Sequence, residues 1–254
     1  LEHQSLPKRY QAVTRPILQA LSDDEKIALS ARILHSLGLK PPFAPVVLLV
    51  GHASQSANNA HAASLDCGAC CGQSGEANSR ALAWMLNEPA VREGLAARGL
   101  SIPSQTRFVA ALHNTTTQEI HGFDLDLLDA GSQAHWQQVQ SWLEQAGHLV
   151  RQQQWPRQQS ALTSSPAPDD MATLFKLFRQ RANDAAQTRP EWGLANNAAF
   201  IMAPRARTQH LNLDGRAFLH EYHADQDTDG SVLELLMTAP MLVTHWINWQ
   251  YHAS

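Results

Sequence analysis

A five-residue apolar run at 46–50, Val-Val-Leu-Leu-Val, most constrains how this chain can fold. The run lies between Pro45 and Gly51, is rich in β-branched residues and contains no polar position, which is typical of a strand covered on both faces. Similar apolar segments lie at 106–112, 198–202, 218–222 and 241–247. Segments with helical spacing alternate with them, so the sequence predicts an α/β fold with a mostly parallel central sheet and helices on both faces.

Helical spacing of apolar residues predicts helices at 22–37, 78–86, 89–98, 133–145, 171–188 and 231–237. The first of these begins at Ser22, an N-cap residue followed by acidic residues, and ends at Gly38. The segment 151–170 is rich in Gln, Ser and Pro, and we expect a mobile surface excursion there, within a single α/β domain over 1–254.

Composition narrows the class of protein. The chain has 254 residues, enough to bury a sizeable core without a disulfide framework. It carries 19 basic and 23 acidic residues, a net charge of −4, which argues against a nucleic-acid-binding protein. Its longest apolar run is far shorter than the ~20 residues that cross a bilayer. The three cysteines lie close together, at 67, 70 and 71, which indicates a reducing compartment.

The long segment at 51–75 consists of small and polar residues and is too long for a simple connector, so we expect a functional loop. His52 lies one residue past the end of the predicted strand, after Gly51, and ligands collect at strand carboxyl ends in open α/β sheets. The loop also carries Asp66 and Cys67, and zinc prefers imidazole and thiolate ligands. The spacing therefore allows a zinc site, for which further donors are His61, Cys70 and Cys71. Equally, these side chains can be a hydrogen-bonded loop histidine and small buried cysteines.

Other motifs in the chain do not complete a known signature. The Gly-Gln-Ser-Gly sequence at 72–75 is one residue short of a serine-hydrolase elbow, and the nearby glycines form no phosphate-binding loop. Cys67 and Cys70 have redox-pair spacing but lack the compact strand-to-helix setting of that motif. The acidic segment 225–230 resembles half of a calcium loop. Leu236 stands where the bidentate glutamate is needed, which favours an acidic turn that caps the next helix.

Longer motifs resemble one known family. They are Gly-His-Ala-Ser at 51–54, Asn-Asn at 58–59, Leu-Asp-Cys-Gly-Ala-Cys at 65–70, Gly-Gln-Ser-Gly at 72–75, Ala-Leu-His-Asn-Thr-Thr-Thr at 111–117, Arg-Pro-Glu-Trp-Gly-Leu at 189–194, and the stretch from Leu-Asp-Gly-Arg-Ala-Phe at 213–218 to Trp-Ile-Asn at 246–248. With these motifs the chain resembles the DabA family of probable inorganic carbon transporter subunits, which work with the membrane partner DabB. The resemblance covers nearly the whole chain and is weakest across 133–170.

The resemblance implies a β-carbonic-anhydrase-like fold and zinc site. In the family the metal is held by Cys, Asp, His and a second Cys, and the last two map onto His52 and Cys67. The first two belong to an upstream Cys-x-Asp-x-Arg element, which this sequence lacks. We therefore expect a carboxyl-side fragment of a longer subunit. In ordinary β-carbonic anhydrases the His and Cys are separated by two residues, so the spacing here is wide.

The resemblance further implies a peripheral subunit on the cytoplasmic side of the cell inner membrane. This subunit belongs to an energy-coupled pump that hydrates CO2 to bicarbonate with Zn2+. The sequence identifies no catalytic residue, but four side chains are candidates for orienting the ligands: Ser54, Asn58, Asn59 and Asp66. Two alternatives remain, a non-catalytic interaction subunit with a structural metal and a thiol redox protein that uses Cys67 and Cys70. Because two ligands do not close a zinc site, we expect the isolated fragment to be inactive.

Overall fold

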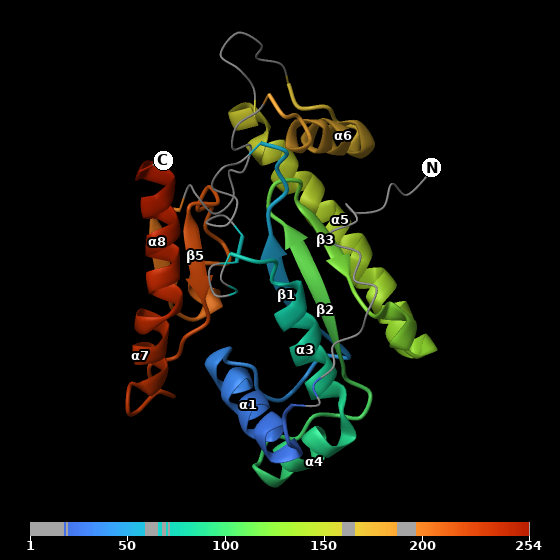
Figure 1. The fold of residues 1–254 in the computed structure, drawn as a ribbon, viewed down its shortest axis with the longest axis vertical. Helices are drawn as coiled ribbons and strands as arrows, with labels where there is room; N and C mark the ends of the chain where they lie inside the picture. Colours follow the sequence, from blue (N-terminus) through green and yellow to red (C-terminus); the bar gives the residue numbers. More distant parts are fainter. Residues whose placement is uncertain are drawn as a thin grey trace.

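The strands of the computed structural model form two separate sheets (Figure 1). In the first, β1 (Val46–Ala53) runs parallel to β2 (Arg107–Asn114), and β2 pairs antiparallel with β3 (Glu119–Gly122). In the second, β4 (Ala199–Met202) runs parallel to β5 (Ala217–His220). The structure describes residues 18, 20–58, 66–67, 70, 72–158, 166–186 and 197–253.

The α/β class is therefore confirmed, whereas a single, mostly parallel sheet is not. Within the described ranges one of the three strand pairs is antiparallel, and the second sheet is not hydrogen-bonded to the first. The likeness to β-carbonic anhydrases is an expectation that this arrangement does not confirm.

Seven α-helices and two short 3-10 helices accompany these strands among the described residues. They are α1 (Asp23–Ser36), α3 (Glu76–Asn87), α4 (Pro89–Ala97), η3 (Leu125–Leu127), α5 (Ala130–Gln158), α6 (Met171–Ala182), η4 (Arg205–Arg207), α7 (Ser231–Thr238) and α8 (Pro240–Ala253). Helix α1 begins with a capping box, in which Ser22 accepts from the Glu25 amide and the Glu25 carboxylate accepts from the Ser22 amide. None of these helices is both long and apolar enough to cross a membrane.

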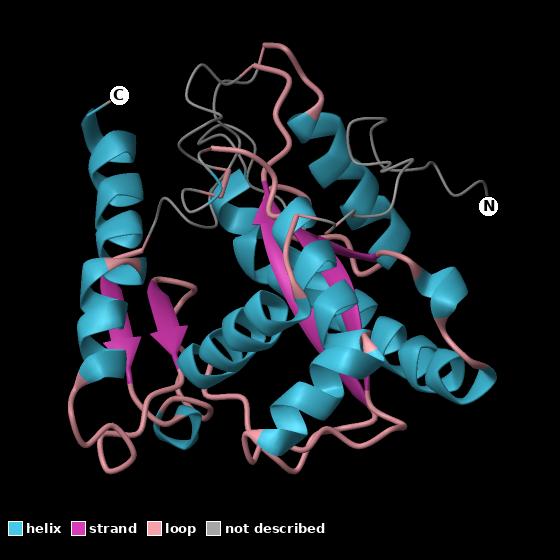
Figure 2. Cartoon of the chain, turned by 60° about the horizontal axis from the view of Figure 1, so that its bottom comes forward, coloured by secondary structure: helices cyan, strands magenta, loops and turns pink. Residues whose placement is uncertain are grey.

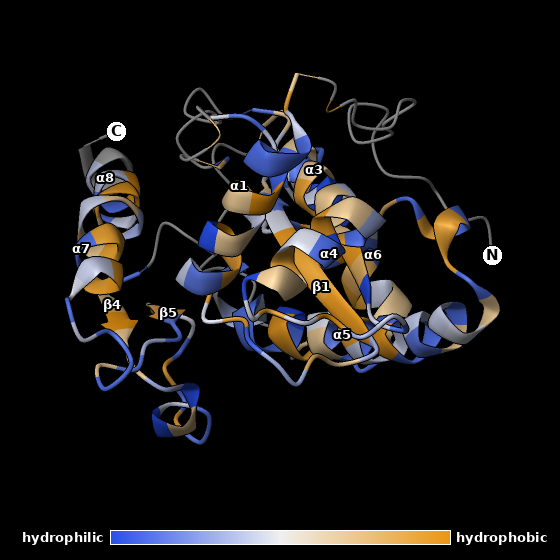
Figure 3. Cartoon of the chain, turned by 90° about the horizontal axis from the view of Figure 1, so that it is seen from below, coloured by the Kyte–Doolittle hydropathy of each residue, from blue (hydrophilic) through white to orange (hydrophobic). Residues whose placement is uncertain are grey.

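Helices cover both faces of the first sheet, as Figure 3 shows with α4 and α5 on opposite sides of β1. Helices α1, α3 and α4 pack together over one face. They contribute Leu34, Leu86 and Leu95, each fully buried, to one core with Phe108 and Leu112 of β2. This apolar core holds β1 and β2 in register, and their carboxyl ends lie at the same edge of the sheet (Figure 2).

The strand expected at 241–247 is wrong, because this segment is part of helix α8. Ile247 is 2% exposed, whereas Leu242, Trp246 and Trp249 are 56%, 42% and 61% exposed. The spacing of four and then three residues places the exposed side chains on one helical face. Short apolar runs rich in β-branched and aromatic residues occur in strands and in buried helices alike, so composition alone did not distinguish them.

The turn after β2 also differs from expectation. We expected 113–117 to cap a helix, but it leads into β3. The Asn114 side chain accepts from the backbone N–H groups of Thr116 and Thr117, and Gln118 adopts a left-handed conformation with φ of 61°. This local turn reverses the chain direction and makes the third strand antiparallel.

The excursion expected at 151–170 begins instead within helix α5, which continues to Gln158. Arg151 is only 5% exposed and donates to the carbonyl oxygens of Thr117 and Gln118. The burial of Arg151 shows that 151–158 packs against the rest of the domain. Residues 159–165 lie outside the described residues. Helix α6 then ends at Ala182, six residues before the expected end at 188.

Candidate functional site

His52 lies where the sequence placed it, at the carboxyl end of β1. The parallel register sets it directly opposite His113 of β2. Residues opposite each other in a parallel pair project to the same face, so two imidazoles lie beside each other at this strand end. His113 Nε2 is 2.8 Å from the Gln118 side-chain oxygen, which gives that second ring a fixed partner.

The imidazole of His52 has the properties of a metal ligand. Its Nδ1 is buried and has no hydrogen-bond partner among the described residues. Burial lowers the pKa of His52, and the nearby Asp66 carboxylate opposes this shift, while His113 adds to it. A lowered pKa favours the neutral ring, which is the form of histidine that binds metals.

Two glycines bring the end of the long loop back to β1. The Gly75 N–H donates to the His52 carbonyl at 2.9 Å. A Cβ built on Gly51 would lie 2.4 Å from the Gly75 carbonyl oxygen, and one built on Gly75 would lie 2.8 Å from the His52 nitrogen. Only glycine fits at either position, so the loop leaves β1 and returns to the same point before α3 begins.

Hydrogen bonds hold Asp66 at this strand end, and Cys67 follows it in the chain. One Asp66 carboxylate oxygen accepts from the Ser54 N–H at 2.6 Å and from the Ser54 hydroxyl at 2.8 Å. The Cys67 N–H donates to the Gln73 carbonyl at 3.1 Å. Ser54 and Asp66, both predicted to orient the ligands, thus connect the strand end to the residue that precedes Cys67.

The remaining predicted residues divide into two groups. The side-chain amide of Asn58 donates to the Ala185 carbonyl at 2.8 Å, which argues against a role of Asn58 in orienting the ligands. Cys70 lies beside Cys67, with 2.9 Å between the two sulfur atoms. Asn59, His61 and Cys71 lie outside the described residues.

Among the residues that the structure describes, no group of three or more His, Cys, Asp or Glu side chains is arranged to hold a metal ion. His52 and Cys67 are zinc-type donors, but zinc sites in proteins use three or four protein ligands. That His52 and Cys67 hold a metal therefore stays a prediction.

A buried polar cluster around Gln55, shortly after His52 in the chain, was not predicted. The Gln55 N–H donates to the Thr116 hydroxyl, the Asn114 amide donates to the Gln55 side-chain oxygen, and the Gln55 amide donates to Asn183. The cluster joins the ends of β1 and β2 to the end of α6. Its signal in the sequence was the run of polar residues at 113–117 directly after an apolar strand, which we assigned only to a cap.

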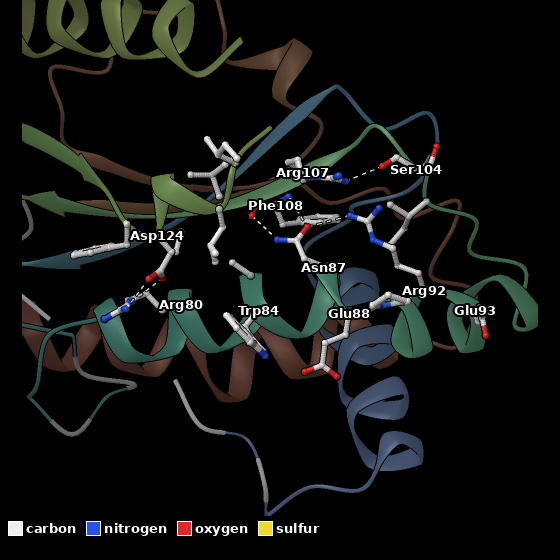
Figure 4. Close-up of a pocket in the computed structure, with 18 of the residues that line it drawn as sticks. Arg80, Trp84, Asn87, Glu88, Arg92, Glu93, Ser104, Arg107, Phe108 and Asp124 are labelled. Atoms are coloured by element: carbon white, nitrogen blue, oxygen red, sulfur yellow. Dashed lines mark hydrogen bonds and ion pairs between the residues drawn. The ribbon is translucent and has the colours of Figure 1, made fainter. Parts of the chain in front are cut away.

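A cavity of about 780 Å3 lies elsewhere, between α3, α4 and the face of β2 (Figure 4). Figure 4 shows Phe108 at its floor, with the Arg80–Asp124 ion pair at one end and Arg92 at the other. The four donated hydrogen bonds of Arg92 go to three backbone carbonyls and to the Asn87 side-chain oxygen. No candidate ligand lines this cavity, so it is separate from the site at the strand end.

Replacing Ser54 with alanine tests the connection to Asp66. The Ser54→Ala variant keeps the backbone N–H bond but loses the hydroxyl bond. If His52 and Cys67 hold zinc in the full-length protein, its zinc affinity should fall by about tenfold. Competition with a chromogenic chelator measures this affinity. Ser104→Ala, whose hydroxyl bonds only to its exposed neighbour Gln105, is the control and should bind zinc as wild type does. An unchanged affinity for Ser54→Ala would show that the hydroxyl bond from Ser54 to Asp66 does not influence the metal.

The fold and the strand-end loop define an α/β protein in which His52 lies opposite His113, and Asp66 is bonded to Ser54, where two parallel strands end. The chain belongs to the DabA family, because the family model described as "Probable inorganic carbon transporter subunit DabA" matches residues 2–254. The family expected from the sequence motifs is thereby confirmed. No solved structure matches the chain.

Curated relatives carry the same description, probable inorganic carbon transporter subunit DabA. The relative from Methylovorus glucosotrophus is 62% identical over 249 residues, which cover 98% of this chain and 29% of the relative. The relative from Paracidovorax citrulli is 60% identical over 253 residues, covering 100% of this chain and 30% of the relative. The relative from Vibrio cholerae is 48% identical and covers 91% of this chain and 27% of the relative. The chain thus spans less than a third of the length of these relatives, in agreement with the expected fragment.

Proposed function

We propose that this chain supplies two ligands, His52 and Cys67, to a zinc site in an inorganic carbon transporter subunit that hydrates CO2 to bicarbonate. The observation that carries the proposal is the His52 ring at the end of a parallel strand, with a buried Nδ1 that lacks a partner among the described residues. The name of the relatives supports the substrate class.

The donor set fits zinc. A neutral imidazole and a thiolate are both preferred ligands of this ion. When bound, zinc would supply a Lewis acid that makes hydroxide available near neutral pH for the hydration of CO2. The chain's own residues position the ligands: Gly75 fixes the His52 backbone, and Ser54 holds the Asp66 carboxylate next to Cys67.

The remaining ligands would come from another part of the longer polypeptide. The edge of β1 that faces away from β2 is where that part would add a strand. The Pro45 and Ala53 carbonyls accept from the β2 side, so the even-numbered residues of β1 direct their backbone groups to the opposite edge. Among the described residues no strand pairs there, and Val50 is 47% exposed. The Gly75 N–H already occupies the His52 carbonyl, so a parallel strand added at this edge would pair along 46–50 and bring its own carboxyl end beside His52.

We also propose that the longer subunit works peripherally on the cytoplasmic side of the inner membrane, with a DabB-like membrane partner. The exposed stripe of Leu242, Trp246 and Trp249 on α8 supports such an association, because this helix contains no Asp, Glu, Lys or Arg. An uncharged, aromatic helix face is the chemistry that protein interfaces bury.

Removal of either ligand tests the proposal. In the full-length subunit, His52→Ala and Cys67→Ala should each lose nearly all bound zinc and the ability to accumulate inorganic carbon, because a ligand is missing. Elemental analysis by mass spectrometry measures zinc per subunit. Cys70→Ser is the matched control, since it removes the neighbouring sulfur and should retain zinc. Wild-type zinc content and carbon accumulation in Cys67→Ala would contradict the assignment.

A structural role for the metal is the second candidate, because His52 lies in β1 and Cys67 in the loop, so that a metal bound to both would tie the loop to the sheet. Such a site would show the same zinc content but no catalysis. Oxygen-isotope exchange between CO2 and water, measured with the full-length subunit and its membrane partner, distinguishes the two roles. Exchange that disappears in His52→Ala supports the catalytic site, and zinc-loaded protein without exchange supports the structural one.

A further inference from the structure

Cys67 and Cys70 form a close dithiol within the loop. Their sulfur atoms lie 2.9 Å apart. The Cys70 N–H donates to the Cys67 carbonyl at 3.0 Å, which closes a tight turn between the two residues. Such turns bring the outer Cα atoms within ~7 Å, and disulfides join Cα atoms that are ~4.4–6.8 Å apart. The backbone therefore already has the span that a disulfide needs.

Neighbouring residues hold both cysteines in this arrangement. The Cys67 N–H bonds to the Gln73 carbonyl, and the Gly72 N–H donates to the Cys67 carbonyl. The Asn78 side-chain amide, at the start of α3, donates to the Cys70 sulfur at 3.1 Å. Both cysteines are only partly buried, so a small oxidant can reach them. Together these contacts leave a nucleophilic pair within reach of a small oxidant.

We propose that Cys67 and Cys70 are a modification site, at which hydrogen peroxide converts the dithiol to a disulfide and thereby removes Cys67 from the metal. One thiolate attacks the peroxide oxygen, which forms a sulfenic acid and releases water after protonation. The second thiolate attacks the sulfenic sulfur and displaces hydroxide, which leaves as a second water. The two sulfurs lose two electrons, the peroxide gains them, and a dithiol reductant reverses the reaction.

The consequence for the metal rests on the proposed function, because it requires Cys67 to be a ligand. A disulfide sulfur carries no thiolate charge and does not bind zinc as a thiolate does. Cys70 would then act as the resolving thiol that makes oxidation of the site reversible. Without a neighbouring thiol, the sulfenic acid on Cys67 would continue to irreversible sulfinic acid.

The experiment oxidises the full-length subunit with hydrogen peroxide after zinc has been removed by a chelator. Remaining thiols are blocked, and mass spectrometry of the peptide that contains residues 67–71 locates the bond. We expect a Cys67–Cys70 disulfide in wild type and in Cys71→Ser, and its reversal by dithiothreitol. Cys70→Ser should instead accumulate sulfinic acid on Cys67. A bond that involves Cys71, or no disulfide at all, overturns the proposal.

A second measurement separates this proposal from the proposed function. Zinc affinity is measured before and after treatment with peroxide. In wild type and Cys71→Ser it should fall by more than about tenfold after treatment and recover with dithiothreitol. This loss is larger than the loss expected when one hydrogen bond to a ligand's neighbour is removed. If the disulfide forms but zinc affinity does not fall, the proposed redox control of zinc binding is overturned, and Cys67 is shown not to be a ligand. If no disulfide forms and zinc binding persists, only the redox control is overturned. Loss of zinc in unoxidised Cys70→Ser also overturns it, since Cys70 would then be a ligand.

Discussion

Replacing Gly51 with alanine is expected to open the loop at the end of β1 and to release zinc from the full-length subunit. The new Cβ would lie 2.4 Å from the Gly75 carbonyl oxygen and 2.6 Å from its carbon. Both are backbone atoms, so no side chain can move aside, and the two segments must separate. Forcing extra atoms into a packed position costs about 1–3 kcal/mol. Because this contact joins the two ends of the loop, we expect that cost to fall mainly on its closure.

Hydrogen exchange of the full-length subunit, read on peptides that cover 66–75, measures this opening directly. Gly51→Ala should exchange the Gly75 amide faster and bind zinc at least about tenfold more weakly. Gly131→Ala is the matched control, because the nearest atom to its Cβ is a side-chain oxygen of Asp129 at 3.4 Å. If Gly51→Ala retains both the exchange rates and the zinc affinity of wild type, then the glycine contact does not close the loop.

Replacing Arg80 with methionine is expected to loosen α3 from β3 and the segment that follows it. The Arg80 guanidinium makes two parallel bonds to Asp124, at 2.8 and 2.9 Å, and a third to Glu76 at 3.1 Å. Its side chain is 7% exposed, and the Asp124 bonds raise its pKa more than burial lowers it. Removal of one partner from a buried pair costs about 3–5 kcal/mol, and the partial exposure of Asp124 places this pair near the lower limit.

Hydrogen exchange on peptides from α3 and from 119–127 reports the change, and we expect protection to fall in both. Arg107→Met is the control, since its 3.3 Å pair with Asp129 lies at the surface and surface pairs contribute about 1 kcal/mol or less. The double variant Arg80→Met/Asp124→Asn should be less than additive, because either change alone breaks the same pair. Equal effects of Arg80→Met and Arg107→Met would show that burial does not strengthen the inner pair.

The position of His52 could be predicted from sequence because one physical signal fixes it. An unbroken apolar run indicates a strand covered on both faces, and the residue after such a strand lies at the edge where ligands gather. The start of α1 could also be predicted, because the side chains of Ser22 and Glu25 each accept from the other's backbone N–H. Both features depend on residues that are close in sequence.

Features that depend on distant residues could not be predicted in this way. The contact between Gly51 and Gly75 appears only after the loop has closed, and glycine is common in polar loops whether or not it contacts a second segment. The same holds for the bond between Ser54 and Asp66 and for the division of the strands into two sheets. Helix α8 was mistaken for a strand because its burial is decided by the elements packed around it rather than by its own composition.

Because the loop is closed at Gly51 and Gly75, the geometry of the strand end does not depend on how long the segment between the two glycines is. Once both ends are fixed, each doubling of a flexible loop adds only about 0.6 kcal/mol of closure entropy. Evolution can therefore lengthen or shorten this segment at little cost to stability. The wide spacing between His52 and Cys67 needs no rearrangement of the sheet, and insertions among relatives should accumulate between Ser54 and Asp66 rather than at the two glycines.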